Sequence, residues 1–271
     1  MQEERPAGIV ISPMGIGEVL DTGFSLARRH YRLLVTITAW GAVPSYGLLA
    51  LGGVFMAPMS RGEPPTGVGV LGLAISIAAY GVGTMITAAA LIVACGFLIA
   101  PTGDPAERSA AYLYGEVAGR LVTMVVLGVL VTIASIPLVI VFPLGVYVWV
   151  RWSVAWVAIL FEHAGPVEAL KRSWALTSGS WWHTAVVMFT SSLIVGILSS
   201  IVGGLFGGAG AVIELITGDH VLGAVLNAAG QGVGFVLIEA FAASILAVLY
   251  FELRARIEGF DLAQRGLQIT Q

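Results

Sequence analysis

Long runs of uncharged apolar residues limit most strongly what this chain can fold into. Residues 68–100 contain no Asp, Glu, Lys or Arg, and a helix needs only about 20 apolar residues to cross a bilayer. The composition agrees, with 58% hydrophobic and 11% charged residues and a mean hydropathy of +0.93, whereas soluble domains carry about 25% charged residues. The sequence therefore predicts an all-α polytopic membrane protein with six transmembrane helices. The expected spans are 33–56, 68–100, 121–142, 143–161, 184–206 and 221–250.

Amphipathic stretches precede the first, third and fifth of these spans, at residues 15–31, 104–120 and 162–179. Apolar residues recur at helical spacing in the first stretch. In the third, Pro166 and Glu168 suit the first turn of a helix, and basic residues follow later, as the helix dipole favours. We expect three helices that lie in the membrane interface. Tryptophans at the third re-entry point have the position of interface anchors; they are Trp174, Trp181 and Trp182.

Lys and Arg are distributed very unequally between the two ends of the expected spans. One side would hold Arg5, Arg28, Arg29, Arg32, Arg108, Arg120, Lys171, Arg172, Arg254, Arg256 and Arg265. The other side would hold Arg61. Because basic residues stay on the cytoplasmic side, we expect both termini in the cytoplasm. The predicted location is the bacterial cytoplasmic (inner) membrane, and no cleavable signal peptide is expected.

The chain is expected to form one membrane domain, residues 15–251, between cytoplasmic tails at 1–14 and 252–271. Residues 207–220 are expected to form an outer loop between the last two spans. An internal repeat is indicated as well, with three units of interfacial helix plus transmembrane hairpin. At an offset of 150 residues, four apolar positions of the first stretch match the third; Leu20, Phe24, Leu26 and Tyr31 match Leu170, Trp174, Leu176 and Trp181.

Arg151 is the clearest candidate for function, because it lies about eight residues inside the expected fourth span. A charge near the bilayer centre costs at least about 2.5–3.5 kcal/mol, so it needs a partner inside the protein. Glu239 in the sixth span is the expected partner, with the amides of Asn227 and Gln231 nearby. Two interpretations stay open: a polar site on a transport or ligand path, and an ion pair that fixes the bundle.

Other polar groups have a functional and a structural interpretation too. Glu162 and His163, at the cytoplasmic end of the fourth span, could move protons or simply be solvated. Acidic and histidine side chains of the expected outer loop could bind a metal, although their spacing matches no known motif; these are Glu214, Asp219 and His220. We expect no metal site and no cofactor.

Small residues in the fifth span form two overlapping GxxxG patterns, at Gly203, Gly204, Gly207 and Gly208. Such patterns allow close helix packing, and dimerisation through the same face is the alternative. The single cysteine, Cys95, is expected to be a small packed residue. Ser178, Ser180 and His183 lack a third group to orient the histidine, so a serine nucleophile is not expected.

Three segments carry a resemblance to a known family. They are 17–34 (GEVLDTGFSLARRHYRLL), 150–182 (VRWSVAWVAILFEHAGPVEALKRSWALTSGSWW) and 250–264 (YFELRARIEGFDLAQ). The chain resembles the glycerophosphoryl diester phosphodiesterase membrane domain and its stand-alone relatives. The resemblance implies six helices and carries over no catalytic residue. In two-domain members the phosphodiesterase activity belongs to a separate soluble barrel with a His-Arg-Gly start, and this sequence does not contain that barrel.

These observations favour a non-catalytic integral membrane module that scaffolds or binds a partner protein or lipid. The alternative is a transporter or channel-like subunit for a small or lipidic substrate, with a polar site around Arg151 and Glu239. A membrane enzyme that acts on lipids is a third hypothesis. Membrane lipids, a protein partner or a second copy of the chain are the expected partners. The net charge of −3 does not suggest nucleic acid.

Overall fold

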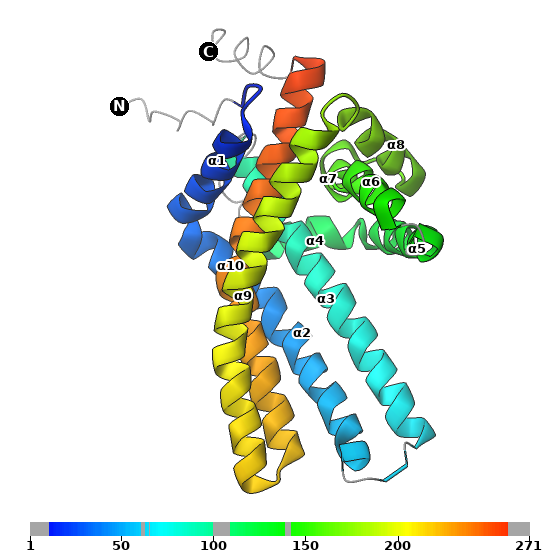
Figure 1. The fold of residues 1–271 in the computed structure, drawn as a ribbon, viewed down its shortest axis with the longest axis vertical. Helices are drawn as coiled ribbons and strands as arrows, with labels where there is room; N and C mark the ends of the chain where they lie inside the picture. The colour runs from blue at the N-terminus through cyan, green and yellow to red at the C-terminus, as the bar shows by residue number, and fades with distance from the viewer. Residues whose placement is uncertain (1–10, 61–62, 65, 100–108, 139–141, 260–271) are drawn as a thin grey trace. The chain divides into compact units, whose positions relative to one another are not determined.

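The computed structural model describes residues 11–60, 63–64, 66–99, 109–138 and 142–259, and each regular element in those ranges is an α-helix (Figure 1). The helices are α1 (Ile16–Arg29), α2 (Tyr31–Ser60), α3 (Gly67–Ile99), α4 (Ala110–Ala118), α5 (Leu121–Leu138), α6 (Phe142–Trp152), α7 (Ala155–Glu162), α8 (Pro166–Leu176), α9 (Trp181–Thr217) and α10 (His220–Glu258). By length and composition, five segments can cross a membrane, or six when the bent pair α4 and α5 counts as one span. The predicted all-α, multi-span class is confirmed.

Parts of several predictions lie outside the described residues. These parts are the tail segments 1–10 and 260–271, the start of the second amphipathic stretch at 104–108, the turn at 139–141, and Arg5, Arg61, Arg108 and Arg265.

The first and third amphipathic stretches form helices that begin in the same way. The backbone N–H of Gly15 donates to Glu18 Oε2 (2.7 Å), and the N–H of Gly165 donates to Glu168 Oε2 (3.1 Å). A glutamate at the third helical position thus satisfies a free N–H at each helix start and complements the helix dipole. In the second stretch, the side chain of Ser109 caps α4.

The expected outer loop at 207–220 is helical instead, because α9 continues to Thr217 and α10 begins at His220. Glycines made this segment resemble a loop, but here they let two helices approach closely. A Cβ added to Gly210 would lie 3.0 Å from the carbonyl oxygen of Gly223. Close helix contacts of this kind favour small residues within apolar bundles.

The two tails also differ from the prediction where the structure describes them. Helix α10 continues to Glu258, and Glu252 is fully buried. Ile11 is fully buried as well, and the N–H of Met14 donates to Glu252 Oε1 (3.3 Å). Residues 11–14 therefore pack against the end of α10 and are not a loose tail.

The described helices group into two compact units. Unit 1 comprises Met1–Tyr31, Ala89–Ser192 and Phe241–Gln271, and unit 2 comprises Arg32–Ala88 and Leu193–Ala240. In unit 2, segments of α2, α3, α9 and α10 pack through small residues, as where Gly53 meets Ala224. In unit 1, the end of α3 packs on α10, where the sulfur of Cys95 lies 3.3 Å from Ser244 Oγ.

Burial in unit 1 follows the predicted repeat. The buried positions of α1 recur in α8 and its C-cap residue at the same offset of 150 residues; Val19, Gly23, Leu26 and Ala27 correspond to Ala169, Ser173, Leu176 and Thr177. The next helices begin at the same offset too, α2 at Tyr31 and α9 at Trp181. Helices α1 and α8 thus share their pattern of burial, and the three-unit repeat stays a prediction.

Candidate functional site

An aromatic cluster in unit 1 holds Arg151, and we call it the Arg151 clasp; it consists of Tyr147, Trp174 and Trp181. The Tyr147 ring packs on Trp174 and Trp181, with ring centroids 5.9 and 5.6 Å apart. The guanidinium carbon of Arg151 lies 5.1 Å from the ring centroids of both Tyr147 and Trp174. Trp181 Nε1 also donates to the Tyr147 carbonyl (3.2 Å). The clasp joins α6, α8 and the start of α9.

Uncharged acceptors, not a carboxylate, hold the guanidinium. Nε and Nη2 of Arg151 donate to the Tyr147 hydroxyl (3.1 and 2.8 Å), and Nη1 donates to the Trp174 carbonyl (3.5 Å). Among the described residues of unit 1, no Asp or Glu oxygen lies within 4 Å of this group. A guanidinium has five N–H donors, so one donor remains on each terminal nitrogen. Two such donors form the fork that binds carboxylate or phosphate oxygens.

A similar aromatic arrangement occurs a second time in unit 1, at residues that the predicted repeat makes equivalent. Phe24 and Tyr31, which correspond to Trp174 and Trp181, pack on Phe241 of α10 with ring centroids 5.5 and 5.9 Å apart. Phe241 therefore occupies the position that Tyr147 has in the Arg151 clasp. In both arrangements, an aromatic residue of the shorter helix and the first residue of the following long helix pack on one ring.

The two arrangements differ one turn after the central ring, on α10 in the first and on α6 in the second. The residue at this position is Ile245 in the first arrangement and Arg151 in the second. Gly23 lies against the backbone of Ile245, and its equivalent Ser173 donates to the Arg151 carbonyl (2.7 Å). Because an isoleucine fills the equivalent position, the packing of this arrangement does not itself require an arginine.

Arg151 lies within the candidate span Pro143–Glu162, and its depth in a membrane stays a prediction. Its guanidinium lies beside the last turn of α8 and the first residue of α9, and thus at the end of a candidate span. This span contains a turn at Ser153 and Val154, between α6 and α7. The expected partner, Glu239, belongs to unit 2, so the Arg151–Glu239 pair stays a prediction.

A cluster of ion pairs binds the ends of α7, α8 and α10 together, and we call it the Glu162 network; it consists of Glu162, Arg172, Tyr250, Arg254 and Glu258. Arg172 Nε donates to both carboxylate oxygens of Glu162 (2.9 and 2.7 Å), and the Tyr250 hydroxyl donates to Oε1 (2.6 Å). Arg172 also pairs with Glu258, and Arg254 pairs with Glu258 (3.0 Å) and Glu162 (3.8 Å). Hydrogen bonding to Glu162 raises the pKa of Arg172. Glu162 is therefore a structural anchor, and its place at the membrane interface stays a prediction.

Arg120 is a second anchor, which sequence reasoning did not single out. It donates to the carbonyls of Ile159 (3.0 Å) and Leu160, at the end of α7, and it contacts His163 and Glu116. A cation at a helix C-terminus satisfies its free carbonyls and complements the dipole. The exposed His163 ends α7 in the left-handed conformation (φ 56°).

The remaining intramembrane candidates lie in unit 2. Gln231 Nε2 donates to Asn227 Oδ1 (2.6 Å), so these two amides partner each other along α10. Glu239 is half-buried on α10. The Tyr80 hydroxyl donates to that of Tyr46 (3.3 Å). A cavity of about 390 Å³ lies between α2 and α10 and is lined in part by Tyr46.

The four glycines of the GxxxG pattern have different surroundings. A Cβ on Gly207 would lie 3.0 Å from Asn227 Nδ2 on α10, whereas Gly204 and Gly208 are exposed with open space beside them. Gly203 has open space at its own Cβ position, although its backbone approaches Gly234 of α10. Packing within the chain thus uses one edge of the pattern, and dimerisation through the exposed edge stays a prediction.

The acidic residues at the α9–α10 junction have structural contacts. Asp219 accepts hydrogen bonds from the N–H groups of Val221 (3.0 Å) and Leu222 (3.1 Å) and so begins α10. His220 contacts the carboxylate of Glu214. Among the described residues, no group of three or more His, Cys, Asp or Glu side chains could hold a metal ion.

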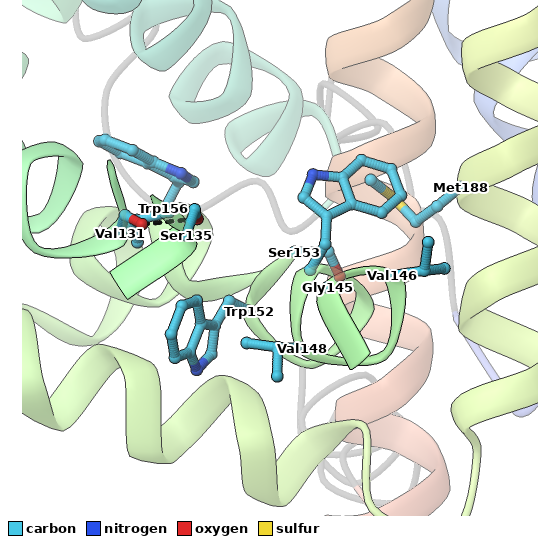
Figure 2. A pocket seen from close by; sticks show the side chains of 10 residues that line it. Val131, Ser135, Gly145, Val146, Val148, Trp152, Ser153, Trp156 and Met188 are labelled. Atoms are coloured by element: carbon cyan, nitrogen blue, oxygen red, sulfur yellow. Dashed lines mark hydrogen bonds between the residues drawn. The ribbon is translucent and has the colours of Figure 1, made fainter. Parts of the chain in front are cut away.

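A cavity of about 530 Å³ lies between helices of unit 1 (Figure 2). Its wall includes residues of α6 and α9, the two helices that also contribute to the Arg151 clasp. We call it the tryptophan cavity; it is lined by Val131, Ser135, Gly145, Val146, Val148, Trp149, Trp152, Ser153, Trp156 and Met188. The hydroxyls of Ser135 and Ser153 already donate to carbonyls of their own segments, Val131 (2.6 Å) and Val150 (2.8 Å). The wall is therefore effectively apolar, as is usual for a small-molecule site of this size.

Two further predicted interfacial residues are exposed. Lys171 is exposed on α8, and Trp182 is 76% exposed while its ring packs on Trp181 (4.6 Å). Comparisons with protein-family models, with curated proteins and with solved structures each found no match to this chain.

Proposed function

We propose that this protein is a non-catalytic integral membrane module that binds a lipid or a partner protein through an anionic group at the membrane interface. The observation that carries the proposal is the Arg151 clasp, which leaves two guanidinium donors and a positive charge without a carboxylate in unit 1. The first copy of the arrangement, with Ile245 in place of Arg151, supports a role for the arginine beyond packing.

The position of the clasp supports an interfacial ligand. Helix α9 has 37 residues, which corresponds to about 55 Å at 1.5 Å per residue. The hydrocarbon core is about 30 Å thick, so α9 extends beyond it at common tilts. Its first residue, Trp181, follows the polar segment 177–180. We therefore place Arg151 at headgroup level, on the side that the distribution of basic residues makes cytoplasmic, together with both termini.

Native mass spectrometry of the purified protein tests this function. The wild-type protein is expected to retain a discrete anionic adduct in mild detergent, and Arg151→Ile is expected to lose it. Isoleucine is the matched replacement, because Ile245 shows that the surrounding packing accepts it. Arg29→Gln removes an exposed charge from α1 and should keep the adduct.

The alternative in which Arg151 only forms an ion pair with Glu239 gives a different result. It requires Arg151→Ile and Glu239→Gln to destabilise the protein alike and to leave the adducts of the wild type unchanged. That pattern would refute the proposed binding function.

A transporter or channel-like subunit with a polar site around Arg151 and Glu239 is the second candidate, favoured by the cavity between α2 and α10 that Tyr46 lines in part. Transport needs water or substrate to reach this cavity. Hydrogen–deuterium exchange then should be measurable for the cavity-lining part of α10, residues 225–237, in reconstituted bilayers. Exchange as slow as that of residues 89–95, which are buried in α3, would instead indicate a dry bundle and argue against transport.

A further inference from the structure

The Arg151 clasp and the tryptophan cavity are built from the same two helices. On α6, Trp152 of the cavity wall directly follows Arg151, and Gly145 lies six residues before it. On α9, Trp181 belongs to the clasp and Met188, seven residues later, lines the cavity. Seven helical residues span about 10 Å and return to nearly the same face. The clasp and the cavity thus share α6 and α9, and on α9 Met188 of the cavity wall lies about 10 Å beyond Trp181 of the clasp.

We infer that the clasp and the cavity together bind one anionic phospholipid, with its phosphate on Arg151 and part of an acyl chain in the tryptophan cavity. This inference rests on the proposed function and specifies its ligand. The two free donors of Arg151 match the bidentate geometry of a phosphate. The wall of the cavity offers a chain apolar surface and no free hydroxyl.

The combination of the two sites selects a lipid over other anions. A soluble phosphate ester would use the guanidinium and leave the cavity without a role. A neutral apolar molecule would fill the cavity and leave the charge of Arg151 without a counter-ion. A membrane lipid has a phosphate and a chain separated along the bilayer normal, in the order in which α9 presents the clasp and the cavity.

The chain offers a matched pair of positions for a test of the cavity. Ser135 and Thr132 both lie on α5, and each hydroxyl donates to a carbonyl four residues earlier. Ser135 lines the cavity, whereas Thr132 is exposed and does not. Ser135→Phe therefore fills the cavity, and Thr132→Phe adds the same ring to the same helix outside it.

The experiment measures the rise of the thermal midpoint with added ligand, which reports affinity because a ligand that binds the native state stabilises it. The probes are phosphatidylglycerol, diacylglycerol with the same chains, and glycerol phosphate. Phosphatidylglycerol should raise the midpoint most. Arg151→Ile should weaken the apparent affinity for phosphatidylglycerol by about tenfold or more, because charge-assisted hydrogen bonds are lost. Ser135→Phe should weaken it too, whereas Thr132→Phe and Arg29→Gln should not. Arg151→Lys keeps the charge but not the fork, and should fall between wild type and Arg151→Ile.

Each other outcome overturns a defined part of the proposal. If Arg151→Ile weakens binding and Ser135→Phe does not, the anion site stands and the chain assignment fails. If glycerol phosphate stabilises the protein as well as the lipid does, the ligand is soluble and the lipid assignment fails. If phosphatidylglycerol stabilises wild type and Arg151→Ile equally, both this inference and the proposed function fail. Thermal midpoints measured without ligand identify any variant that is misfolded. If Arg151→Ile is misfolded, the affinity of Arg151→Lys decides whether Arg151 binds the lipid.

Discussion

Glu162→Ala is expected to lower the thermal midpoint of the detergent-solubilised protein by about 5–8 °C. The substitution removes the acceptor of Arg172 and Tyr250, whose hydrogen bonds hold α8 and α10 to the end of α7. Hydrogen bonds to charged groups contribute about 1.5–3 kcal/mol, and a domain-sized protein shifts by about 2–4 °C per kcal/mol. The carboxylate is only 23% exposed, so the pair is less weakened by solvent than a surface ion pair.

Neighbouring residues on α8 provide the control for Glu162. Arg172→Ala should destabilise the protein nearly as much as Glu162→Ala, whereas Lys171→Ala removes an exposed cation next to it and should change the midpoint by no more than about 2 °C. The double variant Glu162→Ala with Arg172→Ala should cost clearly less than the sum of the single variants, because the two residues share their bonds. Additive effects would mean that the network does not couple α7 to α8.

Gly23→Ala is expected to lower the midpoint by about 5 °C. A Cβ at this position would lie 2.6 Å from Ile245 Cγ1 and 2.8 Å from Ile245 Cα. Backbone atoms of α10 cannot move aside as a flexible side chain can, so α1 would have to shift outward. Overpacking of this kind costs about 1–3 kcal/mol. The same thermal melt measures the effect.

The same helix offers a substitution with the opposite expected sign. A Cβ at Gly17 would meet no atom within 4 Å, so Gly17→Ala is expected to raise the midpoint by about 2 °C, because alanine favours a helix by about 0.5–1 kcal/mol over glycine. Equal effects at Gly17 and Gly23 would contradict the close contact of α1 with α10.

Sequence patterns predicted the helices well where local physics decides them. Apolar runs located the long helices, and Pro166 with Glu168 marked the start of α8 at the residue where the structure begins it. The prediction of a loop at 207–220 was wrong for a physical reason, because glycines taken by themselves indicate a turn. Its glycines instead permit a close approach between Gly210 and Gly223, which lie on two different helices and are not linked by any local pattern.

The candidate site was found in part. Arg151 stood out because a charge inside an apolar run needs a partner, but the sequence suggested a carboxylate and not an aromatic clasp. The sequence does contain a signal for an aromatic clasp. Tyr147 lies four residues before Arg151 and therefore on the same helix face. The partners of Glu162 came from α8 and α10, far along the chain, and no local pattern identifies such pairs.

The burial of Cys95 makes this chain well suited to site-directed labelling. It is the single thiol of the sequence and is fully buried beside Ser244. Water-soluble maleimides should therefore leave the unmodified protein unlabelled in intact cells. A cysteine introduced at exposed Arg29, or at Leu215 near the far end of α9, then reports the side of the membrane that it faces, without prior removal of the native thiol.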